Sequence, residues 1–312
     1  MIGFCGLTLA HPIVNGSGTF DAIAAQRAFG DALLEDFPFS AFVSKTITLA
    51  PRDGNPPPRL WETPAGMINS IGLPNRGLEG YLEHDLPLLA RLPVPLITNV
   101  MGSTAQEVSR LVEAIGERDE IAAIELNVSC PNVSTGLDIG ANPESLGALV
   151  RAVRPLTGKP LIVKLTPNTA DVANVAVAAE NEGADAVSLI NTLRATAFDP
   201  GQRDTPRPWL GGGTGGLSGP AIRGVALAQV ASVAQRVGIP IIGMGGVGTG
   251  EHAYDLLSAG ATLVAVGTES FRDPAAGSRI AAELKSLQIA EIPSTSVKMA
   301  QAQVEVDMNS SD

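Results

Sequence analysis

The sequence predicts an α/β protein folded as a closed (β/α)8 barrel, and three observations lead to this prediction. Eight short apolar stretches are typical of buried strands, segments with helical periodicity alternate with them, and no linker-like change of composition separates them. The 312 residues also fit the usual length of one such barrel. A doubly wound open sheet, which alternates strands and helices in the same way, is the alternative.

The predicted strands are short apolar runs without a helical period. The clearest runs from Ile121 to Leu126, after a charged turn at residues 117–120, and Pro131 stops the ladder because proline has no N–H to donate. The eight strands are expected at residues 13–16, 41–45, 95–100, 121–127, 160–165, 186–191, 239–244 and 263–267.

The predicted helices carry apolar residues three and four positions apart. One follows a capping box from Thr104 to Glu107, and another follows Asn142 and Pro143, which are typical first residues of a helix. The apolar stripes cover residues 108–115, 146–153 and 172–179, and further helices are expected within 22–35, 76–91, 220–237, 251–259 and 274–287.

Residues 1–287 therefore form one predicted domain. Two connections within it, residues 46–75 and 192–219, are too long for plain turns, and loops of this length in a compact domain are usually lids or binding loops. Residues 288–312 are polar and poor in large apolar side chains, so we expect a mobile C-terminal tail.

Composition argues against several classes of protein. A net charge of −11 disfavours a surface for nucleic acid or an anionic membrane. The first four residues lack the basic start of a signal peptide, and no uncharged apolar run reaches the roughly 18 residues of a membrane span. Cys5 and Cys130 lie far apart without disulfide-framework spacing, which suits a reducing compartment. We expect a soluble cytoplasmic protein, with Cys5 a packing residue.

A protein-bound metal has little support. The three histidines, His11, His84 and His252, do not follow predicted strands, so neither a zinc site nor a Ser-His-Asp triad is indicated. Two cysteines cannot supply the four thiolates of a [2Fe–2S] cluster.

Polar residues follow the predicted strands instead. In a barrel the carboxyl ends of all strands face one mouth, which is where such folds carry out chemistry. The polar residues at these ends are Ser17, Lys45, Thr46, Asn99, Asn127, Cys130, Lys164, Asn191 and Thr192. We expect them to form one site.

Glycine-containing pairs follow the last two strands, at the place where barrels often hold a phosphate on backbone N–H groups. These pairs are Gly245 with Gly246 and Gly267 with Thr268, and a third wall could come from Gly215 with Gly216. Residues 243–248 also fit the letters of a dinucleotide fingerprint, but they follow the seventh strand and not the first. Ordinary glycine turns are the alternative.

Two lysines and several asparagines complete the predicted mouth. Lys45 and Lys164 would act as counter-charges, one to a ligand carboxylate or phosphate and one to the electron-rich end of a cofactor ring. Uncharged amides suit the edges of a flavin or pyrimidine ring, and they are Asn69, Asn99, Asn127, Asn132 and Asn191. The alternatives are solvated lysines and asparagines that only form turns.

Cys130 has two possible roles. A free cysteine is usually a small buried hydrophobe. This one precedes a loop at residues 133–140 able to move, where a thiol with an ordinary pKa of about 8.5 could become the base for an acidic C–H beside a carbonyl.

Taken together, these stretches resemble one family, the catalytic chain of class 1 dihydroorotate dehydrogenase, a flavoprotein. The matching stretches are residues 15–18, 44–46, 54–56, 69–75, 127–132, 163–165, 191–192, 214–220, 243–246 and 267–268, in family order over about residues 3–287. The resemblance implies an FMN at the barrel mouth. Gly224 and Glu269 depart from the family pattern, where proline and a smaller residue are expected.

The resemblance also implies the role of each site residue. The FMN phosphate would lie on Gly216, Gly245, Gly246, Gly267 and Thr268, and the FMN ring on Ser17, Lys45, Thr46, Asn99, Asn127, Lys164 and Ile190. Dihydroorotate would be held by Lys45, Asn69, Ser70, Ile71, Gly72, Leu73, Asn127, Asn132, Asn191 and Thr192. Cys130 would take the C5 proton while a hydride leaves C6 for the flavin.

The type of enzyme follows from smaller features. Class 2 members use serine as the base and carry an N-terminal membrane extension, whereas this sequence has Cys130 and we expect no such extension. Residues 214–220 and 127–132 look most like the NAD-linked type, which implies a homodimer with a separate chain carrying FAD and a [2Fe–2S] cluster. A fumarate-linked enzyme, a chain like dihydropyrimidine dehydrogenase, and a flavin-free phosphate-binding barrel are the alternatives.

Overall fold

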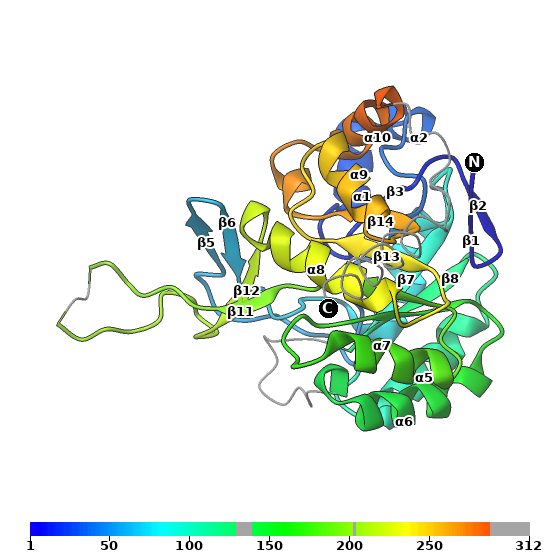
Figure 1. The fold of residues 1–312 in the computed structure, drawn as a ribbon, viewed down its shortest axis with the longest axis horizontal. Helices are drawn as coiled ribbons and strands as arrows, with labels where there is room; N and C mark the ends of the chain where they lie inside the picture. Colours follow the sequence, from blue (N-terminus) through cyan, green and yellow to red (C-terminus); the bar gives the residue numbers. More distant parts are fainter. Residues whose placement is uncertain (129–138, 202–203, 288–312) are drawn as a thin grey trace, which may run out of the picture.

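Eight parallel strands form one sheet in the order β3-β14-β13-β10-β9-β8-β7-β4. A computed structural model describes residues 1–128, 139–201 and 204–287. The strands are β3 (Ile13–Asn15), β4 (Phe42–Val43), β7 (Leu96–Val100), β8 (Ala123–Asn127), β9 (Leu161–Lys164), β10 (Ala186–Leu189), β13 (Ile241–Met244) and β14 (Leu263–Val266). Each of these eight strands lies within a stretch predicted as a strand, and their parallel order confirms the (β/α)8 barrel (Figure 1).

A buried side chain joins the two ends of this sheet. Asn15 Nδ2 donates to the Val43 carbonyl at 2.8 Å, and Asn15 Oδ1 accepts from the Val43 N–H at 2.8 Å. One amide thus supplies a donor and an acceptor to β4 from β3, in place of a backbone ladder. The Ser40 N–H adds a hydrogen bond to the Ile13 carbonyl at 3.0 Å, so the barrel closes between β3 and β4.

Helices alternate with the strands and cover the outside of the barrel (Figure 1). They are α1 (Ala22–Phe29), α2 (Ala32–Glu35), α3 (Gly77–Gly80), α4 (Leu86–Leu89), α5 (Ala105–Gly116), α6 (Pro143–Val153), α7 (Val172–Asn181), α8 (Arg223–Ala234), α9 (Gly250–Ser258) and α10 (Ala276–Ser286). A π-helical turn, η1 (Tyr81–Asp85), links α3 to α4. Short 3-10 turns are η2 (Ile139–Ala141), η3 (Arg154–Leu156), η4 (Pro220–Ile222) and η5 (Thr268–Phe271). No helix in the described ranges has the length and apolar character needed to cross a membrane.

The predicted helix starts are confirmed. Thr104 Oγ1 accepts from the Glu107 N–H at 3.2 Å, and Asn142 Oδ1 accepts from the Ser145 N–H at 2.9 Å. The Glu107 carboxylate accepts from the Ser103 N–H, one residue before the cap, at 2.6 Å. These side chains satisfy N–H groups that a helix leaves unpaired in its first turn.

The two long connections differ from the prediction of loops, because parts of both pair in a second sheet. Strands β5 (Leu60–Thr63), β6 (Gly66–Asn69), β11 (Leu193–Ala195) and β12 (Gly215–Ser218) form an antiparallel sheet in the order β11-β12-β6-β5. Figure 1 shows this sheet projecting from one side of the barrel. Trp61 and Trp209 pack edge to face beside it, with ring centroids 5.6 Å apart.

The barrel interior has an apolar floor. The hairpin of β1 (Ile2–Phe4) and β2 (Leu7–Leu9) contributes Phe4 and Leu9, which pack with inward residues of the barrel strands. A larger apolar cluster fills the space between the barrel and its helices. Alternate residues of each strand therefore face the interior and the helix layer, as expected for a barrel.

Candidate active site

A layer of polar side chains lies above the apolar floor on four neighbouring strands. Each of β7, β8, β9 and β10 places an apolar residue inward and a polar residue two positions later, on the same face. The apolar residues are Ile97, Ala123, Ile162 and Ala186. The polar residues, named here the inner polar layer, are Asn99, Glu125, Lys164 and Ser188, and each is at most 5% exposed.

Hydrogen bonds connect this inner polar layer. Asn99 Nδ2 donates to Glu125 Oε2 at 2.5 Å, and Ser188 Oγ donates to Glu125 Oε1 at 2.7 Å. Lys164 Nζ donates to Ser17 Oγ at 3.0 Å. Burial lowers the pKa of Lys164, while the negative charge of Glu125 raises it.

Asn99 keeps one polar atom for a ligand. Its Oδ1 is buried, and among the residues that the structure describes it has no hydrogen-bond partner. Buried acceptors are usually paired, so an unpaired one at the mouth side of a barrel suits a ligand donor.

A second set of predicted residues meets at the end of β8. Asn127 Nδ2 donates to Thr46 Oγ1 at 3.4 Å, and Asn191 Nδ2 donates to Asn127 Oδ1 at 3.4 Å. The Asn191 Oδ1 atom accepts from the Thr192 N–H at 2.8 Å. The structure thus brings together polar residues that follow three different strands.

The second sheet carries other predicted substrate residues to the same mouth. Asn69 Nδ2 donates to the Gly216 carbonyl at 3.3 Å, and Ser70 Oγ donates to the Thr214 carbonyl at 2.8 Å. A Cβ on Gly216 would lie 1.9 Å from Thr192 Oγ1, so only glycine lets β12 approach this residue. Ile71, Gly72 and Leu73 follow β6 in the chain, and their backbones take φ values of +76° at Gly72 and +56° at Leu73.

The three predicted glycine segments gather near the start of α8. A Cβ on Gly246 would lie 2.6 Å from the Cβ of Arg223, the first residue of α8. Thr268 Oγ1 donates to Ser218 Oγ at 2.8 Å, which joins the residue after Gly267 to the end of β12. Ile190 is buried, and its Cγ1 would lie 3.3 Å from a Cβ on Gly245.

The start of α8 is capped by backbone and not by a side chain. Among the described residues no side chain accepts from its first turn, as is also the case at α10, and the 3-10 turn η4 runs directly into α8, where the Arg223 N–H donates to the Pro220 carbonyl. The backbone N–H groups of the glycine segments beside this helix are the groups that suit a phosphate. The arrangement fits the predicted phosphate segments.

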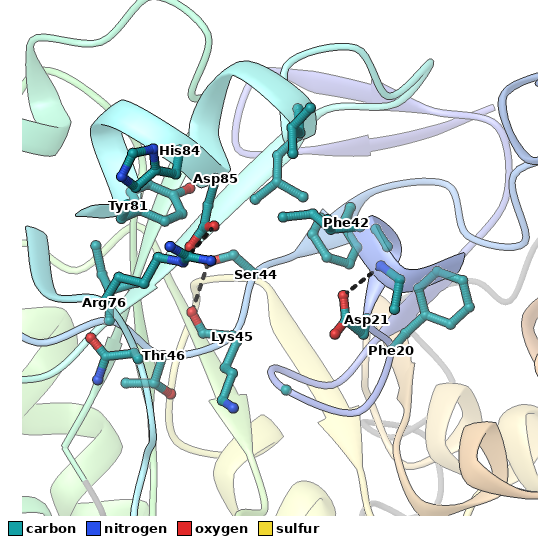
Figure 2. A pocket seen from close by; sticks show the side chains of 18 of the residues that line it. Phe20, Asp21, Phe42, Ser44, Lys45, Thr46, Arg76, Tyr81, His84 and Asp85 are labelled. Atoms are coloured by element: carbon teal, nitrogen blue, oxygen red, sulfur yellow. Dashed lines mark hydrogen bonds and ion pairs between the residues drawn. The ribbon is translucent and has the colours of Figure 1, made fainter. Parts of the chain in front are cut away.

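Lys45 lies on a separate part of the mouth, in the wall of a cavity of about 560 Å³ shared with Phe20, Asp21 and Tyr81. Figure 2 shows its side chain below Arg76 and Asp85, which form an ion pair at 3.6 Å. Lys45 is exposed, yet the surrounding protein desolvates its ammonium group enough to lower its pKa; Asp21 opposes this shift and Arg59 adds to it.

Two predicted residues lie outside the described part of the chain. Cys130 and Asn132 fall within residues 129–138, so their predicted roles stay predictions. The described chain reaches Val128, directly after the β8 residue Asn127.

Sequence reasoning missed Glu125 and Ser188. The available signal was a single acid inside the apolar run from Ile121 to Leu126, two positions before Asn127 and hence on the same face of the strand.

The family model described as dihydroorotate dehydrogenase matches residues 2–287. A protein of Desulforudis audaxviator is 46% identical over 288 residues, 91% of each chain, and one of Geobacter sulfurreducens is 43% identical over the same share. A protein of Pelobacter propionicus is 45% identical over 90% of each chain. All three are named dihydroorotate dehydrogenase B (NAD(+)), catalytic subunit. With a family match over nearly all of its described residues, the chain belongs to the dihydroorotate dehydrogenase family.

Proposed function

We propose that this chain oxidises dihydroorotate to orotate in pyrimidine biosynthesis and that it is the catalytic subunit of an NAD-linked enzyme. The observation that carries the proposal is 43–46% identity, over about nine-tenths of both chains, to proteins bearing that name. The polar mouth of the barrel supports it, because amides, two lysines and glycine-rich backbone segments suit a flavin and a small anionic ring.

FMN is the proposed cofactor, and when bound it would accept a hydride from the substrate. Gly216, Gly245, Gly246, Gly267 and Thr268 would bind its phosphate, supported by the close approach of Gly246 to Arg223 and by the hydrogen bond between Thr268 and Ser218, which bring these segments together. The ring would lie on Ser17, Lys45, Thr46, Asn99, Asn127, Lys164 and Ile190. Asn99 Oδ1 is buried and has no hydrogen-bond partner in the part of the chain that the structure describes, which supports this placement, since a ring N–H can donate to it.

Dihydroorotate would bind through charge and amide contacts. The Lys45 ammonium group would neutralise the substrate carboxylate. Ring amides would pair with the asparagines, and the contacts between Asn127, Asn191 and Thr192 support their acting as one surface. The remaining proposed substrate contacts are Asn69, Ser70, Ile71, Gly72, Leu73 and Asn132.

Cys130 is the proposed base. Its thiolate would take the proton from C5 of dihydroorotate while the hydride leaves C6, so that a C5–C6 double bond forms. In the sequence it lies three positions after Asn127 at the mouth, and three residues of extended chain span at most about 11 Å. This short spacing supports a base that acts beside the proposed substrate contacts.

The electrons would leave through a partner subunit that carries FAD and a [2Fe–2S] cluster and reduces NAD⁺, with this chain forming a homodimer. The words "catalytic subunit" and "NAD(+)" in the names of the relatives support a separate electron-transfer chain. The sequence has two cysteines, and such a cluster normally uses four thiolates, which also favours placing it elsewhere.

An anaerobic experiment tests the proposal. The purified chain is loaded with FMN and mixed with dihydroorotate without an acceptor, and the flavin absorbance is followed. Loss of the absorbance of oxidised flavin is expected. Bound flavin that dihydroorotate does not bleach would favour another dihydropyrimidine as substrate, and a chain that takes up no FMN would overturn the proposal.

The acceptor is tested separately. Fumarate, quinone and NAD⁺ are added to the reduced chain, alone and with a candidate partner subunit. We expect reoxidation by NAD⁺ only with the partner. Rapid reoxidation by fumarate alone would identify the fumarate-linked type instead.

A further inference from the structure

Glu125 is a buried acid that the proposed reaction does not use. Its side chain is 1% exposed and faces the barrel interior from β8, two residues beyond Ala123 of the apolar floor. A buried carboxylate destabilises a fold unless donors or an opposite charge compensate it. Here Asn99 and Ser188 each donate to one oxygen, and Lys164 supplies the nearby positive charge.

The carboxylate determines which way the Asn99 amide faces. A carboxylate can only accept hydrogen bonds, so the Asn99 atom that lies 2.5 Å from Glu125 Oε2 has to be Nδ2. The amide is planar, which directs Oδ1 away from Glu125. With a different neighbour the amide could rotate by half a turn and present Nδ2 in place of Oδ1.

The Asn99 Oδ1 atom is the acceptor that this orientation leaves available. Asn99 is fully buried, and within the described ranges no group donates to its Oδ1. Lys164 of the same layer donates to Ser17, and Asn127 at the end of β8 donates to Thr46. These are proposed ring contacts, so the unpaired oxygen belongs to the same surface.

We propose that Glu125 is a positioning residue, which fixes the Asn99 amide so that Oδ1 accepts a hydrogen bond from the N–H of the bound ring. The inference rests on the proposed function, because the ring is that of FMN. An oxidised flavin ring carries one N–H, at N3. Ser188 donates to the other carboxylate oxygen, Oε1, whereas Asn99 is oriented by Oε2.

The test compares FMN with its N3-methyl analogue, which lacks this N–H. Both are titrated into the apo chain. The dissociation constant of the analogue divided by that of FMN gives a ratio, which is larger the more the N–H contributes to binding. In the unmodified chain FMN is expected to bind more tightly. In Glu125→Asp, whose carboxylate is shorter by one methylene of about 1.5 Å, the ratio should fall by about five- to tenfold, as expected for the loss of one hydrogen bond.

Three further variants test whether Glu125 acts on the bound ring through Asn99. Asn99→Ala should lower the ratio as much as Glu125→Asp does, and the double variant should lower it no further, because both changes remove one interaction. Ser188→Ala is the matched control: it removes the other hydrogen bond to the same carboxylate, and the ratio should stay within about twofold of the original.

A role of Glu125 in folding alone predicts a different result. It would lower the melting temperature and weaken both ligands equally, leaving their ratio unchanged. An unchanged ratio in Glu125→Asp, or additive effects in the double variant, would overturn the inference. So would equal binding of the two ligands by the unmodified chain. Failure of the proposed function is distinguishable, because the unmodified chain would then bind no FMN or would not be bleached by dihydroorotate.

Discussion

Lys164 Nζ lies 3.0 Å from Ser17 Oγ, and this hydrogen bond joins the end of β9 to the segment after β3. The two strands are four positions apart in the eight-stranded sheet, so the lysine reaches across the barrel interior. Lys164 is 5% exposed, and burial lowers its pKa while Glu125 opposes the shift. A ring that covers the inner polar layer would therefore lie on the Lys164 ammonium group, which β9 carries and Ser17 binds from the opposite side of the barrel.

Replacement of the proposed base should separate binding from chemistry. Cys130→Ala is expected to retain FMN while the anaerobic reduction of the flavin by dihydroorotate slows by about 10² or more, the usual contribution of a general base. Stopped-flow absorbance measures this rate. Cys5→Ala is the control, because Cys5 lies in the hairpin at the barrel floor, where its thiol donates to the Asp185 carbonyl. An unchanged rate in Cys130→Ala would exclude the role.

Loss of the Lys45 charge should weaken substrate binding selectively. Lys45→Met is expected to raise the KM for dihydroorotate by roughly tenfold or more, the value of a charge-assisted contact. Dihydrouracil lacks the carboxylate, so its KM should change little. Lys159→Met, which removes a charge just before β9 at the other end of the barrel, is the control. Equal effects on the two substrates would argue against a contact with the carboxylate.

The same lysine gives a pH dependence with a definite sign. The surrounding protein desolvates the Lys45 ammonium group and lowers its pKa, so it loses its proton at a lower pH than an ordinary lysine, whose pKa is about 10.4. Because the charged form binds the anion, the KM for dihydroorotate should rise with pH, beginning below that value. Steady-state kinetics at alkaline pH measure the rise, which should be absent in Lys45→Met.

The barrel could be predicted from the sequence because its signals are local. Each strand is an apolar run with no helical period, and helix starts such as Thr104 carry their own capping residues. The second sheet was missed because its pairing is not local. Gly216 of β12 pairs with Asn69 of β6, far away in sequence, and glycines have little preference for strands.

The site was predictable only in part, for a related reason. Position at the carboxyl end of a strand indicated Lys164 and Asn127, since these ends share one mouth. Glu125 lies inside a strand, and only the register that sets it opposite Asn99 shows that the acid meets an amide instead of apolar neighbours. The closure of the sheet by Asn15 depends on three-dimensional proximity in the same way.

Tyr81 should make stability fall at high pH. It is buried, its hydroxyl lies 2.8 Å from Thr98 Oγ1, and burial raises its pKa from 10.0 to about 12. Between these values the folded chain keeps the proton that the unfolded chain has lost. The free energy of unfolding should therefore fall as pH rises through this window, by about 2–3 kcal/mol in total.

Tyr81→Phe should remove this contribution and flatten the fall, as measured by denaturant unfolding between pH 9 and pH 12, values that bracket the ordinary pKa of about 10. The pKa of Cys5 is also raised, to about 11, so both chains in the comparison carry Cys5→Ala. Near neutral pH the phenylalanine variant should lose about 1 kcal/mol through its missing hydrogen bond. Equal slopes at high pH would show that Tyr81 does not titrate in this way.

The phosphate segment can be tested with two neighbouring glycines. Gly246 has φ of +73°, and a Cβ there would lie 2.6 Å from the Cβ of Arg223, so Gly246→Ala should destabilise the chain by about 1–2 kcal/mol or more and weaken FMN binding. At Gly248 the nearest atom to a Cβ would be Glu269 Oε2 at 3.6 Å, an ordinary contact. Gly248→Ala should therefore change stability by less than about 0.5 kcal/mol. Melting temperature and FMN titration measure both variants. If Gly246→Ala binds FMN as tightly as Gly248→Ala does, the phosphate does not depend on this turn.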